Sequence, residues 1–193
     1  MNEQFRQRIF SKRMMTFAIL SIVITGFLGY FLIDAKTGTA MMEEFMESVD
    51  HIFTDGEIKV FPLFLNNLTA ALVMVLTGFI PFIYFPAIIG AVNGTIIGVA
   101  LKFAGTGIAP LKLFLAGILP HGIFEIPALI LAIAIGLSIC HSLVLKIMGR
   151  ESIPMGDILI TSAITYVKYI IPLLIVAAFI ETYITPMILG RFL

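Results

Sequence analysis

His121 and Glu125 are the residues best placed to do chemistry, because they interrupt the otherwise apolar stretch AGILPHGIFEIPALILA at residues 116–132. A spacing of four residues puts both side chains on one face of a helix. Such a pair can share a hydrogen bond, relay a proton or supply two ligands to a metal ion. The stretch therefore predicts a polar site inside an apolar environment.

A metal ion would need at least a third protein ligand. Cys140 and His141 lie about 30 Å farther along such a helix, which is too far to help. Only His51, in a polar segment, remains within reach, and the chain has no HExxH motif. We therefore expect no bound metal, no other cofactor and no catalytic residue.

Lys168 is another ionisable residue in an apolar stretch, roughly 16 Å along a helix from Asp157. At that depth it could pair with Glu125, either as a structural lock between two helices or as part of a functional site. Alternatively, its long stem reaches an interface or a cavity, and Glu125 pairs with His121 alone. With three amides added, the predicted polar intramembrane site consists of Asn66, Asn67, Asn93, His121, Glu125 and Lys168.

The elements that must position these residues are transmembrane helices. Of 193 residues, 60% are hydrophobic and 12% are charged, and the mean hydropathy is +1.08. That composition is far more apolar than a soluble domain, and the formal net charge of zero gives no reason to expect nucleic-acid binding. We expect an all-α polytopic bundle forming a single membrane domain over residues 1–193. Stretches of about 20 apolar residues predict spans at 14–33, which we interpret as a retained anchor, and at 61–82, 84–103, 121–141 and 159–183.

Residues 109–149 are too long for one simple span, since about 40 helical residues would extend roughly 60 Å. Pro120 removes a backbone donor and clashes with the preceding turn, so the helix should break just before it. The sequence then predicts a short broken or re-entrant segment at 110–119, followed by the span at 121–141.

Residues 34–59 form a long polar segment that contains a predicted amphipathic helix at 39–54. Such a helix either lies on the membrane or caps the bundle. Lysine and arginine cluster before the first span and again near residues 146–150, which favours a cytoplasmic N-terminus in the cell membrane. The 34–59 segment, rich in Asp and Glu, is then extracytoplasmic.

Small residues predict close helix packing. In the span at 84–103 a glycine recurs at every fourth position, and further glycines follow Pro120. The predicted packing set is Gly90, Gly94, Gly98, Gly122 and Gly136. The pattern fits contact within one chain or between the two copies of a homodimer.

The blocks FLNNLTAALVMVLTGFI, NGTIIG and LPHGIFEIPALILAIAIGLSI, which fall within about residues 61–140, resemble in that order the signature of the stage II sporulation protein M family. The most specific part is His-Gly followed by Glu-x-x-Ala after a proline. By this resemblance the characteristic positions are Asn66, Asn67, Gly78, Asn93, Gly94, Gly98, Pro120, His121, Gly122, Glu125 and Gly136. Lys168 lies outside the matched blocks.

The resemblance implies an integral membrane protein, since the family's namesake holds cell-wall hydrolases at the septum during sporulation. We expect a non-enzymatic scaffold or accessory subunit that contacts the lipid bilayer and recruits membrane or extracytoplasmic proteins. One alternative is a component of a transporter or export system with a polar site around His121 and Glu125, because discontinuous helices form such sites in transporters. The second alternative is an intramembrane metal-dependent hydrolase.

Overall fold

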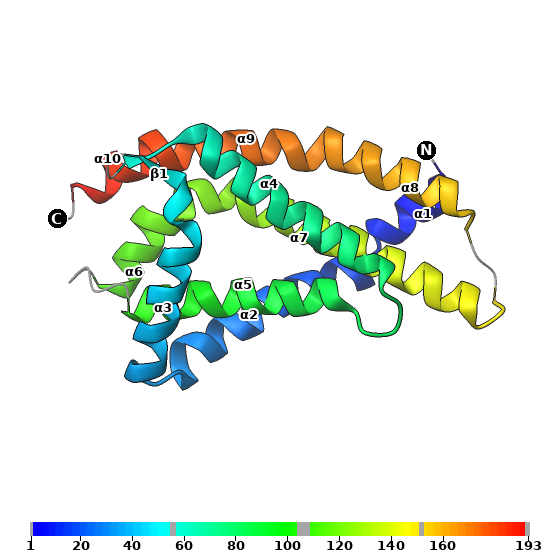
Figure 1. The fold of residues 1–193 in the computed structure, drawn as a ribbon, viewed down its shortest axis with the longest axis horizontal. Coiled ribbons are helices and arrows are strands. Elements are labelled where there is room, and N and C mark those ends of the chain that lie inside the picture. The colour runs from blue at the N-terminus through cyan, green and yellow to red at the C-terminus, as the bar shows by residue number, and fades with distance from the viewer. Residues whose placement is uncertain (1, 55–56, 104–108, 151–152, 192–193) are drawn as a thin grey trace.

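The computed structural model describes residues 2–54, 57–103, 109–150 and 153–191. The chain is an all-α helical bundle, as the composition predicts, and its long helices run roughly along one axis (Figure 1). Asp55 of the acidic segment and residues 104–108 lie outside the described residues. Within these described ranges, five helices are long and apolar enough to cross a membrane: Glu3–Leu32, Val60–Phe79, Phe85–Phe103, Pro110–Ile147 and Met155–Leu189.

Helix α7 (Leu119–Ile147) forms the centre of the bundle. In the segment that contains it, 72% of the most apolar 18-residue window is buried, against 17–28% for the other four candidate spans. Figure 1 shows α9 (Ile171–Phe179) on one side of α7 and α2 (Lys12–Leu32) and α5 (Phe85–Phe103) on the other, while α4 (Val60–Leu76) runs diagonally across α7. Large apolar side chains on the outer helices, such as Phe27, Phe31 and Val167, are exposed, as lipid contact requires.

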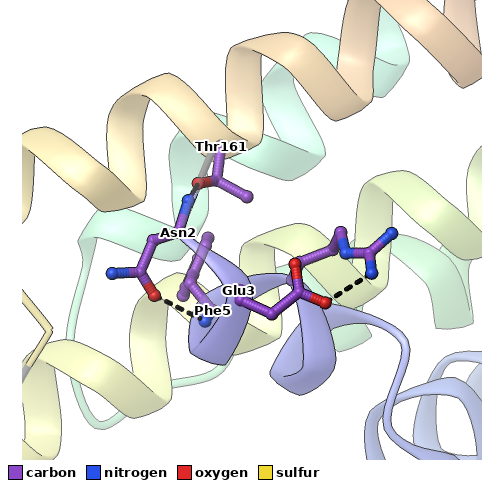
Figure 2. A network of polar contacts seen from close by, with 5 residues as sticks. Asn2, Glu3, Phe5 and Thr161 are labelled. Atoms are coloured by element: carbon purple, nitrogen blue, oxygen red, sulfur yellow. Dashed lines mark hydrogen bonds and ion pairs between the residues drawn. The ribbon is translucent and has the colours of Figure 1, made fainter.

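The first candidate span, Glu3–Leu32, begins with a short helix that precedes α2. Asn2 caps α1 (Glu3–Ile9) by accepting from the Phe5 N–H, and its own N–H donates to Thr161 Oγ1 at 2.8 Å (Figure 2). Phe5 and Ile9 are fully buried. Of the basic residues expected as a simple cytoplasmic flank, Arg6 and Arg8 therefore belong to a packed helix that ties the N-terminus to α8 (Met155–Thr165), whereas Lys12 and Arg13 begin α2 (Lys12–Leu32).

Glycines bring α2 and α5 into backbone contact. A Cβ added at Gly94 would overlap the Ile22 carbonyl, and one at Gly98 would overlap the Gly26 carbonyl. From the α2 side, a Cβ at Gly29 would lie 2.7 Å from the Thr95 carbonyl oxygen. The stripe on α5 is thus used within one chain, so it does not offer a face to a second copy.

The remaining predicted glycines divide into two groups. Gly136 on α7 leaves no room for a Cβ against the Met74 carbonyl of α4, and Gly90 packs against Ile133 and Ser21. Gly122 differs from the other predicted packing glycines, because a Cβ there would meet only side chains of its own helical segment, at 3.5 Å or more. Its small size is not needed for helix contact.

Three π-helical turns each end two residues before a proline. They are η3 (Phe114–Ile118), η4 (Tyr166–Ile170) and η5 (Ile180–Ile184), which precede Pro120, Pro172 and Pro186. Proline has no backbone N–H, so one hydrogen bond of the regular α-helix is lost. A π turn before the proline shifts the hydrogen-bond register and lets the helix continue past it. The α-geometry is therefore interrupted near Pro120, but the helix does not break: α6 (Pro110–Leu113), η3 and α7 form one helical run, so residues 110–119 are not a separate re-entrant segment.

Helix α3 (Ala35–Val49) crosses the end of the bundle that lies away from the N-terminus (Figure 1). Asp34 caps the start of this helix, because its carboxylate accepts from the Thr37 N–H at 3.1 Å and from the Thr37 hydroxyl at 2.8 Å. These two bonds lower the pKa of Asp34 from its ordinary value. A 3₁₀ turn η1 (Asp50–Ile52) and a two-stranded antiparallel hairpin, β1 (Phe53–Thr54) and β2 (Glu57–Ile58), lead back to α4. Of the two arrangements expected for an amphipathic helix here, the structure has the cap.

Candidate functional site

The polar residues of α7 meet a carboxylate from the last membrane helix. His121 Nε2 lies 3.9 Å from Glu125 Oε2 and 3.9 Å from Glu181 Oε2. One potential ligand atom from each residue lies within 4.8 Å of the others. Their side chains are only 14%, 23% and 21% exposed, respectively. The sequence pair is therefore a cluster of three ionisable residues.

Two of the π turns position this cluster. Glu181 belongs to η5 itself, and His121 follows η3 by three positions. Thr185, on the turn after η5, holds the other side of the imidazole, because its Oγ1 lies 3.4 Å from His121 Nδ1. Irregular turns of this kind often occur at functional sites in helices.

The cluster lines a cavity of about 350 Å³ beneath α3. Three amides share the cavity: Asn66, Asn67 and Asn93. Asn66 Nδ2 donates to Asn67 Oδ1 at 3.4 Å, and Asn93 Nδ2 donates to the Ile89 carbonyl of its own helix at 2.9 Å. The Asn93 bond stays within α5 and does not cross to Pro120, although Asn93 faces the same cavity as His121.

Apolar residues of the cap form the outer wall of this cavity. Phe45, Met46 and Val49 of α3 contribute, followed by Ile52 and Phe53. The apolar side of the amphipathic helix thus faces the polar cluster across the cavity, while its acidic side faces outward.

Lys168 is not part of the site. It lies exposed in η4, where its Nζ sits 5.5 Å from the centre of the Tyr169 ring, and it is absent from the cavity lining. The buried residues of this segment, Ile170 and Leu174, are the ones that point into the bundle. No ion pair between Glu125 and Lys168 forms in the described part of the chain, because the helix turns the lysine outward.

Glu181 is the site residue that sequence reasoning missed. It lies inside the predicted span at 159–183, so the cost of an ionisable side chain in a membrane marks it as a candidate. Its role depends on contacts with Glu125 and His121, which lie 56 and 60 positions away in the sequence, and no local pattern indicates such contacts.

A known protein family matches most of the chain. The family model for stage II sporulation protein M matches residues 16–186. The chain belongs to the stage II sporulation protein M family. Because the match ends at residue 186, it includes Glu181 as well as His121 and Glu125.

Relatives say little more about the site. This stage II sporulation protein M family chain is 35% identical over 128 residues to an uncharacterized protein of the archaeon Methanocaldococcus jannaschii. The alignment covers 66% of this chain and 72% of the archaeal protein. No solved structure matches the chain.

Proposed function

We propose that this protein is a non-enzymatic membrane scaffold or accessory subunit that binds partner proteins through the α3 cap. The observation that supports this role is that α3 is held on one side and charged on the other. Gly38 packs onto the Phe103 ring and Val49 is buried, whereas three glutamates on the outer side, Glu43, Glu44 and Glu47, are exposed.

A helix fixed in this way is preorganised for binding, because little conformational entropy is lost when a partner binds it. In the described residues none of these three carboxylates takes part in an ion pair. The partner is therefore expected to present a basic surface, and its affinity is expected to fall as salt concentration rises.

Charge distribution supports an extracytoplasmic position for the cap. The N-terminus and α3 lie at opposite ends of the bundle (Figure 1). Six basic residues lie at the N-terminal end (Arg6, Arg8, Lys12, Arg13, Lys146 and Arg150), and five lie at the α3 end (Lys36, Lys59, Lys102, Lys112 and Arg191). By the positive-inside rule this small excess favours a cytoplasmic N-terminal end.

A photocrosslinking amino acid placed at Glu44, in the native host membrane, tests the proposal. We expect one dominant adduct with a protein that has an extracytoplasmic domain, and we expect it to weaken at high salt. Changing Glu43 and Glu47 to Lys should abolish the adduct, whereas the charge-retaining change of both to Asp should preserve it. Adducts only between copies of this chain, or none, would refute the scaffold role.

The buried cluster favours a second candidate function, a subunit of a transporter or export system. Ionisable residues inside membrane helices commonly line the path of an ion or a proton. Five membrane helices in one chain are few for a complete transporter, so this function requires further subunits. A crosslinker at Lys146, at the opposite end of α7, should in that case trap an ATP-hydrolysing protein, whereas the scaffold role predicts the partner at Glu44.

A further inference from the structure

We propose that His121, Glu125 and Glu181, together with the amide of Asn67, bind one divalent transition-metal cation of the zinc class in the cavity beneath α3. This site is independent of whether α3 docks a partner. It joins α7 to the C-terminal membrane helix, two elements that meet only in the folded protein.

The ligand geometry supports this assignment. Zinc bonds of about 2.0–2.1 Å to nitrogen or oxygen place tetrahedral ligands about 3.3 Å apart. The two carboxylate oxygens lie 3.9 Å from His121 Nε2, so small rotations of Glu125 and Glu181 bring them to bonding positions. The glutamates come from separate helices and approach the same imidazole nitrogen.

The orientation of the imidazole fits a metal ligand. A metal-binding histidine usually donates its second ring N–H to a neighbouring acceptor, which fixes the tautomer. Thr185 Oγ1 lies 3.4 Å from His121 Nδ1 and is placed to accept that proton. Nε2 is then unprotonated, with its lone pair available for a cation, and lies 3.9 Å from an oxygen of each carboxylate.

Charge balance points to a divalent cation. Two carboxylates lie close together inside the helical bundle, and no lysine or arginine is among the described residues that line the cavity. Two unpaired negative charges in such a place are expensive. A divalent cation cancels both, and the imidazole selects a transition metal over magnesium or calcium.

Asn67 supplies an independent observation. It is 8% exposed, it lines the same cavity, and its Nδ2 has no hydrogen-bond partner. Amide oxygen and nitrogen are assigned from their bonds, so exchanging them in both Asn66 and Asn67 keeps the bond between the two residues. That exchange leaves the Asn67 oxygen free as a fourth ligand. The cavity of about 350 Å³ also has room for a cation with several water ligands, at about 30 Å³ per water.

Zinc titration of the full-length protein in detergent tests the site, with a chromophoric chelator as competitor and no polyhistidine tag. All samples carry His51→Asn and His141→Asn, which remove the other imidazoles. We expect one zinc ion per chain. Glu181→Gln keeps the side-chain shape and should lower affinity by about 100-fold or more, at or beyond the upper end of the effect of outer-shell changes. Glu44→Gln, an exposed carboxylate on α3, is the matched control and should leave affinity unchanged.

X-ray absorption of the zinc-loaded protein gives a readout that does not depend on any variant folding. We expect only nitrogen and oxygen neighbours near 2.0–2.1 Å, with an imidazole signature. Four results would overturn the proposal: no zinc binding at micromolar concentration, equal affinity of the Glu181→Gln protein, a sulfur neighbour, or tighter binding of calcium or magnesium. Tighter binding of calcium or magnesium would mean that the carboxylates hold a hard cation without the imidazole.

Discussion

Replacing Gly98 by Ala should destabilise the protein strongly, because the new methyl group meets backbone on the neighbouring helix. The Cβ would overlap the Gly26 carbonyl and lie 2.8 Å from the Tyr30 nitrogen. Neither group can move without moving α2, so the helices must separate. Overpacking typically costs about 1–3 kcal/mol of folding stability. Because both contacted atoms belong to the α2 backbone, we expect a cost at the upper end, about 3 kcal/mol.

The matched control is Gly156→Ala in α8, where an added Cβ meets nothing within 4 Å. Because alanine is a better helix former than glycine by up to about 1 kcal/mol, this change should be neutral or slightly stabilising. Comparing the two isolates steric overlap from helix propensity.

The chain provides its own assay. It has no tryptophan and a single cysteine, and Cys140 is fully buried in α7. A thiol-reactive dye therefore reports unfolding from one position during a thermal ramp in detergent. At about 2–4 °C per kcal/mol for a chain of this size, Gly98→Ala should lower the Tm by roughly 6–12 °C. A Tm within 1 °C of the parent protein would refute the backbone contact between α2 and α5.

Two further predictions use the same assay. Lys168→Met should leave the Tm nearly unchanged and should not rescue Glu125→Gln, because the lysine contacts the Tyr169 ring and not the cavity. Recovery of stability in the double variant would instead indicate that Glu125 and Lys168 form an ion pair in the parent protein. Tyr166→Phe should cost about 1 kcal/mol, since the hydroxyl donates to the Leu68 carbonyl at 2.6 Å, and an unchanged Tm would contradict that bond between α4 and the last helix.

Composition and periodicity were sufficient to predict five membrane-spanning helices, but not the short helix α1. Runs of apolar residues have one stable solution in a membrane, because every backbone group must be bonded within its own helix. The amphipathic spacing around Phe45 and Val49 likewise indicated α3. What the pattern could not settle was whether α3 caps the bundle or lies on lipid, since both surfaces are apolar.

The prolines show where local rules reach their limit. Pro120 predicts a disruption, and a disruption is present, but its form depends on whether neighbouring helices keep the chain in place. Here the bundle around α7 is continuous, so the strain appears as the π turn η3 within an unbroken helical run. The same reasoning applies before Pro172 and Pro186.

The site was predictable in part. His121 and Glu125 were identified from their own stretch, and Asn66, Asn67 and Asn93 line the cavity with them. Lys168 and Glu181 both lie in the last predicted span. Two π turns change the register of that helix, so regular helical spacing does not predict which side of the helix each residue occupies. That register places the glutamate in the cavity and turns the lysine away from it.

The backbone contact between α2 and α5 has a consequence for synthesis. Residues 33–84 separate the two helices, so α2 is complete before the chain that fills its groove exists. At roughly 5–20 residues per second, α2 waits in the bilayer for several seconds with Gly26 and Gly29 facing acyl chains. Assembly therefore requires α5 to displace lipid from a groove that has already formed, and a translational pause within residues 33–84 would prolong the interval in which another helix can occupy it.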